Sequence, residues 1–134
     1  MKAYEILEHT TDLKIRAFGK TKEELFLNML RGMFLGAGAK VQNKKSVPRE
    51  IKIKSSDEQS LIVDFLSEAL TLSDINNEAY LEVRFKKLIE TELKAEIFGT
   101  PVKNFSTEIK AVTYHGVEIK KVGDHWEATV LFDI

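Results

Sequence analysis

The amino-acid sequence predicts an α+β fold: a single domain over residues 1–134, with an antiparallel or mixed β-sheet and two amphipathic helices packed on one face. Three observations favour this class. The chain has 134 residues, a length typical of one domain. Two segments repeat apolar residues every three or four positions, as amphipathic helices do. The second half alternates apolar and polar residues almost throughout, and strands gathered in one half of a chain are typical of α+β proteins.

The N-terminal part is expected to form two strands, over residues 3–7 and 12–18. In the second strand, apolar and polar side chains alternate, so the two kinds face opposite sides of the sheet. The apolar set is Leu13, Ile15 and Ala17, and the polar set is Asp12, Lys14 and Arg16. Gly19 ends this run.

Thr21 and Glu24 form a capping box, in which each side chain bonds to the backbone near the other, and this predicts the start of the first helix. The helix is expected to end near Leu35. Its buried stripe comprises Leu25, Phe26, Met29, Leu30, Met33 and Phe34. Glycines stop the helix, and the polar residues that follow predict a loop over residues 36–48.

A second capping box, from Ser56 to Gln59, predicts a helix that ends near Asp74. Its buried stripe comprises Leu61, Ile62, Phe65, Leu66, Ala69 and Leu70. Asp64 and Glu68 fall one turn apart on a single face of this helix. A solvated surface is the favoured interpretation of that pair, and a metal-binding pair is the alternative.

The other strands are expected over residues 49–54, 80–85, 88–98, 108–114, 116–122 and 125–133. Gly123 and Asp124 mark a turn before the last strand. In that strand Trp126, Ala128, Val130 and Phe132 face one way, and Asp133 faces the other. If the first and last strands of the chain pair, Asp12 and Asp133 meet at one edge of the sheet.

Composition excludes several classes of function. The chain contains no cysteine, which rules out disulfides, thiolate metal sites and a cysteine nucleophile. The net charge is −1, whereas a dedicated nucleic-acid binder is usually basic. Neither a glycine-rich phosphate loop, nor a nucleophile elbow, nor a histidine pair at helical spacing is present. Because no apolar run approaches the ~20 residues that span a bilayer, and no signal peptide begins the chain, we expect a cytoplasmic protein without membrane association.

Two aspartates near the ends of the chain are the strongest candidates for function. Asp12 begins the second strand, Asp133 closes the last, and the main-chain carboxylate of Ile134 follows at once. If the strands pair, three anionic groups converge, and such a cluster repels itself unless a cation or protons neutralise it. The sequence therefore predicts a divalent-cation site at Asp12, Asp133 and Ile134.

His9 bears on which metal would bind. It lies three residues before Asp12 in a polar run, where a ligand role competes with a hydrogen bond at the end of a strand. A site built only of oxygen atoms favours calcium, with magnesium as the alternative. Coordination by His9 would favour manganese or zinc.

Four segments of the sequence are similar to one known family. Glu8-His9-Thr10-Thr11-Asp12-Leu13 resembles the opening motif of the archease family, and Glu108-Ile109-Lys110-Ala111-Val112-Thr113-Tyr114-His115 resembles a second archease motif. Ser60-Leu61-Ile62-Val63-Asp64-Phe65-Leu66 resembles the family's second helix, and Phe132-Asp133-Ile134 resembles its ending. Thr11 replaces the usual alanine, which adds a hydroxyl beside the expected metal position. The four matches fall in register across nearly the whole chain, which makes them specific together.

The resemblance implies a function in RNA joining. Archeases stimulate an RtcB-type RNA ligase, which joins RNA ends in tRNA splicing and RNA repair, and they are not themselves ligases. The resemblance implies help with the ligase's guanylylation and multiple turnover, contact with RNA only through the ligase, and metal ligands at Asp12, Asp133 and Ile134. It also places Lys110 in a family motif, as a candidate contact with the partner or its active site; an ordinary exposed strand lysine is the alternative.

The residues by themselves leave two other functions open. Two aspartates with His9 could activate water in a free-standing metal-dependent hydrolase. A chaperone, or an adaptor for RNA-modifying enzymes, would need no metal. We therefore expect a metal-binding accessory protein and keep these two as alternatives.

Overall fold

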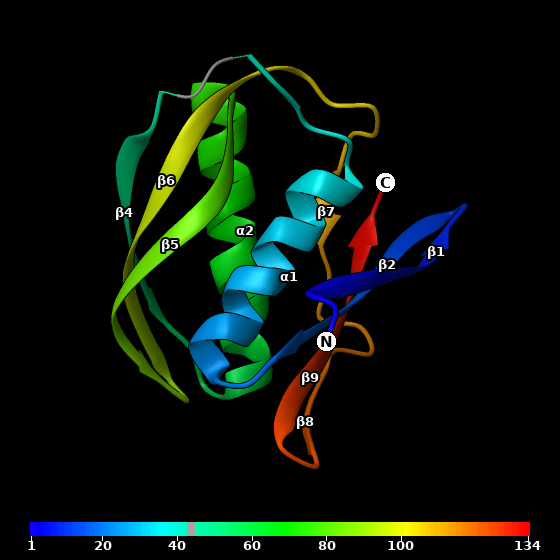
Figure 1. Ribbon diagram of the computed structural model, residues 1–134, viewed down its shortest axis with the longest axis vertical. Coiled ribbons are helices and arrows are strands. Elements are labelled where there is room, and N and C mark those ends of the chain that lie inside the picture. The colour runs from blue at the N-terminus through cyan, green and yellow to red at the C-terminus, as the bar shows by residue number, and fades with distance from the viewer. Residues whose placement is uncertain (43–44) are drawn as a thin grey trace.

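The computed structural model describes residues 1–42 and 45–134, which form two helices between two antiparallel sheets (Figure 1). Asn43 and Lys44, which belong to the loop expected over residues 36–48, lie outside the described residues. The predicted α+β class is confirmed, and strands do pair antiparallel as expected. No helix in the described part of the chain is long and apolar enough to cross a membrane.

The first sheet joins the two ends of the chain. Strands β1 (Tyr4–His9), β2 (Asp12–Gly19) and β9 (His125–Asp133) are neighbours in that order. The far edge of β9 is shared by β7 (Ala111–Val112) and β8 (Glu118–Val122), which pair with different parts of it. The strand expected over residues 108–114 is shorter in the structure. It is reduced to β7, although the N–H groups of Lys110 and Thr113 also donate to main-chain oxygens of β9. The last strand pairs with β2, as the candidate site requires.

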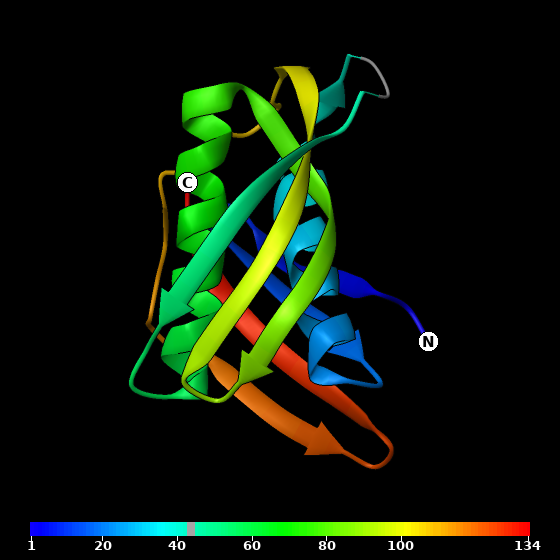
Figure 2. The same cartoon turned by 90° about the vertical axis from the view of Figure 1, so that its left-hand side faces the viewer.

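The second sheet is centred on β6 (Glu92–Asn104), which pairs with β4 (Val47–Lys54) and β3 (Lys40–Val41) along one edge and with β5 (Glu78–Ile89) along the other. Figure 2 shows this sheet in front of the helices and the first sheet behind them. The sequence predicted a single sheet. The strands divide because the helices are apolar over more than one face, so each sheet covers one side of the helical layer.

Helix α1 (Lys22–Gly36) begins as its capping box predicts. Thr21 Oγ1 accepts the N–H of Glu24 at 3.1 Å, and the Glu24 carboxylate accepts the N–H of Lys20 at 3.0 Å. The helix packs on β2 of the first sheet and on β5 of the second. Residues from most of its circumference are buried: Leu25, Phe26, Asn28, Met29, Leu30, Gly32, Met33 and Phe34. This broad buried surface explains why one sheet is not enough to cover it.

Helix α2 (Glu58–Asn76) begins one residue later than its sequence predicts. The N-cap is Asp57 rather than Ser56, because Asp57 Oδ1 accepts the N–H of Ser60 at 2.7 Å. A carboxylate at this place is favoured by the positive end of the helix dipole. The backbone hydrogen bond from Ser60 holds the pKa of Asp57 below its ordinary value. The expected stripe is buried except for Leu70, which is only partly so.

A polar cluster joins β4 to β5 within the second sheet, and its Glu78 and Tyr80 are buried. Both oxygens of the Glu78 carboxylate accept from the Arg49 guanidinium, at 3.1 and 3.0 Å, and one also accepts from the Tyr80 hydroxyl at 2.8 Å. Burial alone would raise the pKa of Glu78, but the hydrogen bonds from Arg49 and Tyr80 outweigh it, and the pKa lies below its ordinary value. Gly99 allows this packing, since a Cβ there would lie 2.3 Å from Glu78 Oε1.

The cluster predicts a loss of stability at high pH. Burial, followed by the hydrogen bond to Glu78, raises the pKa of Tyr80 from 10.0 to about 12. The folded state thus favours the neutral hydroxyl, and this contribution is fully present below pH 10 and lost as the pH rises to about 12. The shift corresponds to about 2–3 kcal/mol. Urea unfolding between pH 9 and 12 should therefore show a steeper decline for the wild type than for Tyr80→Phe. Parallel curves for the two proteins would contradict this assignment.

Candidate metal site at the paired ends of the chain

Asp12 and Asp133 face each other across the β2–β9 pair. Asp12 is the register partner of Asp133, and Leu13 is the partner of Phe132. Side chains directly opposite in an antiparallel pair lie on one face, with Cβ atoms roughly 4.5–5.5 Å apart. Leu13 and Phe132 are fully buried beneath the helices, so both aspartates point to the other face of the sheet. The expected convergence of these two residues is confirmed.

The two carboxylates are left without protein partners. Asp12 is partly exposed and Asp133 is exposed. Throughout the described ranges, 1–42 and 45–134, neither carboxylate forms a hydrogen bond or an ion pair with another residue. Like charges placed directly opposite in a sheet repel each other. The arrangement therefore supplies two free anionic groups on one face, a donor set that suits a hard divalent cation.

Ile134 follows Asp133 and is anchored. Its side chain is partly buried and packs against the hydrophobic core, on the opposite face of the sheet from the aspartates. The described residues contain no group of three or more histidine, aspartate or glutamate side chains placed to hold a metal. A cation at this place would therefore complete its coordination with main-chain oxygens, water or groups from a partner.

His9 lies on the other face of the sheet. Its register partner is Leu13, whose side chain points toward the helices, and its Nε2 lies 3.2 Å from the hydroxyl oxygen of Thr107. The structure thus does not bring His9 together with the two aspartates. No sequence pattern singles out Thr107, which is distant along the chain and belongs to the segment between β6 and β7.

Lys110 is joined to the aspartate pair through its backbone. Its N–H donates to the main-chain oxygen of Asp133 at 2.7 Å, just before β7 pairs with β9 at Ala111. The side chain is exposed, and within the described part of the chain its ammonium group has no hydrogen bond or ion pair. The backbone of Lys110 therefore lies beside that of Asp133, and its exposed ammonium group is available to a ligand or partner.

Asp64, the other carboxylate considered as a metal ligand, already has partners. The Ser55 hydroxyl donates to it at 2.6 Å, and the Tyr114 hydroxyl donates to its second oxygen. The bond to Asp64 raises the pKa of Tyr114 above its ordinary value. Glu68 remains exposed nearby. These contacts favour a structural role for Asp64, linking α2 to the segments that carry Ser55 and Tyr114.

Comparison with known proteins agrees with the family that the sequence motifs indicate. The model of the Archease protein family matches residues 4–134. The chain belongs to the archease family. It is 40% identical to the protein archease of Methanosarcina barkeri, with 99% of this chain and 97% of that protein covered. It is 35% identical to the archease of Pyrococcus abyssi over the whole of both chains.

Solved structures of archeases and related proteins share the fold. The solution structure of Methanobacterium thermoautotrophicum protein 1598 matches with a TM-score of 0.70 and 28% identity, over the whole of both chains. A Thermotoga maritima archease, described as a possible chaperone, matches with a TM-score of 0.68 and 23% identity, covering 97% of this chain and 96% of that one. The second likeness concerns the fold alone.

The facing carboxylates predict that replacing one of them stabilises the protein when divalent cations are absent. Asp12→Asn removes a like-charge pair that costs roughly 0.2–1 kcal/mol. In a chelator at low ionic strength, we expect the Tm to rise by about 1–4 °C, and the gain to shrink as salt is added. Differential scanning calorimetry measures both. Glu90→Gln, which neutralises an exposed carboxylate in the β5–β6 turn, is the matched control. A fall in Tm for Asp12→Asn, or an equal rise for the control, would contradict the repulsion.

Proposed function

We propose that this archease is a metal-binding accessory protein that stimulates an RtcB-type RNA ligase in tRNA splicing and RNA repair. One observation carries the proposal. In a member of this family, the carboxylates of Asp12 and Asp133 face each other and have no hydrogen-bond or ion-pair partner among the described residues. The protein would assist the guanylylation and multiple turnover of the ligase, and would meet RNA through the ligase. A chain with no cysteine suits the reducing cytoplasm, where we place this activity.

In this proposal the metal ligands are Asp12, Asp133 and the main-chain oxygens of Ile134. All are oxygen donors, which favours calcium over metals that prefer nitrogen. A bound cation would neutralise the facing carboxylates and add positive charge beside Lys110. The exposed ammonium of Lys110 could then meet an anionic group of the ligase or of its nucleotide. His9 has no part in this ligand set, because its register places it on the opposite face.

Several features favour an accessory role over an enzymatic one. The proposed metal site lies on a sheet face where Asp133 is exposed, whereas enzymes usually carry out their reactions in concave pockets. The net charge of −1 does not suit direct binding of RNA. A metal-dependent hydrolase remains the alternative that the two carboxylates allow. The hydrolase and the accessory protein predict different results when the ligase is absent. A hydrolase would then cleave RNA, and an accessory protein would leave it intact.

Multiple-turnover RNA joining tests the proposal. With ligase limiting, and GTP and metal supplied, the wild-type protein should raise the number of turnovers per ligase. Asp12→Asn and Asp133→Asn should lower the stimulation toward the rate of the ligase alone, since each removes a negative charge from the proposed cation site while keeping the shape of the side chain. Lys110→Ala should retain part of the stimulation. Glu90→Gln should match the wild type.

Circular dichroism on each variant separates loss of function from loss of fold. A folded Asp12→Asn, Asp133→Asn double variant that stimulates as well as the wild type would contradict the metal mechanism. Incubation of the protein with RNA alone should leave the RNA intact. Cleavage that depends on metal and on both aspartates would instead support the hydrolase.

A further inference from the structure

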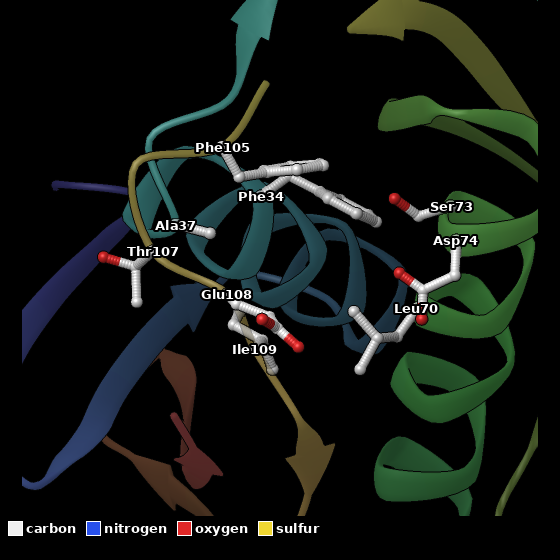
Figure 3. A pocket seen from close by; sticks show the side chains of 9 residues that line it. All are labelled: Phe34, Ala37, Leu70, Ser73, Asp74, Phe105, Thr107, Glu108 and Ile109. Atoms are coloured by element: carbon white, nitrogen blue, oxygen red, sulfur yellow. The ribbon is translucent and has the colours of Figure 1, made fainter. Parts of the chain in front are cut away.

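A cavity of about 110 Å³ lies between the C-terminal ends of the two helices, and neither aspartate of the proposed metal site lines it (Figure 3). One wall comes from α1, the second from α2, and the third from the segment that links β6 to β7. The apolar part of its lining comprises Phe34, Ala37, Leu70, Phe105 and Ile109. Neither the aspartate pair nor the proposed ligase function uses this cavity.

The backbone holds the third wall in place. The N–H of Thr107 donates to the main-chain oxygen of Ala37 at 3.0 Å, and that of Ser106 donates to Gly38 at 3.4 Å. The rings of Phe34 and Phe105 lie 6.3 Å apart, which closes one side of the cavity. These contacts form within the protein itself, so the cavity is preformed rather than opened by a ligand.

Two carboxylates give the cavity a charge. Asp74 from α2 and Glu108 from the linking segment both line the cavity. Figure 3 shows the carboxylate oxygens of both residues pointing toward the space between the two helices. Both residues are exposed, and neither carboxylate has an ion pair or hydrogen bond in residues 1–42 and 45–134. An anionic occupant would be repelled. A neutral one would cover the carboxylates without compensating their charge.

We propose that this cavity receives a lysine side chain of a partner protein. A lysine combines an apolar four-carbon stem, which the lining buries, with an ammonium group that can meet Asp74 and Glu108. The size agrees, since a cavity of about 150 Å³ holds the six carbons of benzene, and the lysine stem with its nitrogen has five heavy atoms. Phe34 and Phe105 add aromatic surface that attracts a cation.

The test is titration of the folded protein with a short blocked peptide, Ac-Gly-Lys-Gly-NH₂, followed by two-dimensional NMR. We expect shifts confined to residues that line the cavity. The matching norleucine peptide keeps the carbon stem and lacks the charge, so it should bind several-fold more weakly. Asp74→Asn and Glu108→Gln should each weaken the lysine peptide by about 1.5-fold to 5-fold, the range for exposed charge pairs. Glu68→Gln, an exposed carboxylate on the same helix but outside the cavity, should change nothing.

Three results would overturn the proposal. One is the absence of shifts at the cavity up to the highest soluble concentration of peptide. Another is equal binding of the lysine and norleucine peptides, which would make the cavity merely apolar. The third is unchanged binding in the Asp74→Asn, Glu108→Gln double variant. Because the titration contains no ligase, RNA or metal, these outcomes are independent of the proposed function.

Discussion

Burial of the inner face of β2 and β9 beneath α1 determines the register of the two strands, and the register places Asp12 opposite Asp133. Leu13 pairs with Phe132, Ile15 with Val130, and Ala17 with Ala128, and all six side chains are at most 1% exposed. A slip of one residue in either strand would turn that strand's apolar side chains outward. Burying a large apolar side chain contributes about 1.5–3 kcal/mol, whereas facing like charges cost only about 0.2–1 kcal/mol. The core therefore forces the carboxylates together.

The same balance explains why a repulsive pair can persist in a stable protein. The fold tolerates a small local cost at Asp12 and Asp133, as proteins often do at functional sites. A bound cation would remove this repulsion, and binding to the folded state alone would add stability by mass action.

The segment before β7 contacts both proposed sites. Lys110 donates its N–H to the main chain of Asp133, and Thr107 and Glu108 form a wall of the cavity. Thus one short segment supports both proposed sites.

The parts of the structure that follow from local pattern could be predicted from sequence. The capping box at Thr21 and the alternation of β2 and β9 depend on neighbours within a few residues, and each is found as expected. The meeting of Asp12 and Asp133 depends on strand pairing that the residues state only as a condition, because local pattern does not say which strands are neighbours. The strand that pairs with β9 is the second one, β2, rather than the first. Asp57 was missed as the N-cap, since two adjacent residues could each cap α2 and only the backbone geometry selects one.

Features that depend on distant packing could not be predicted. The division into two sheets arises from how widely α1 is buried, which the helical stripe alone does not reveal. The face on which His9 lies depends on the β1–β2 register, which shifts between Ile6 and Glu8. The cavity draws its lining from both helices and from a linking segment far from them in sequence, so no single stretch carries its pattern.

The central claim is that Asp12 and Asp133 hold one cation between them. Crystals soaked in manganese, with data collected near its absorption edge, locate such an ion directly by anomalous scattering. The account predicts a single peak at the β2–β9 end, at roughly 2.0–2.6 Å from a carboxylate oxygen of each aspartate. A crystal that shows these side chains facing each other, with no peak between them or with manganese bound elsewhere only, would contradict it.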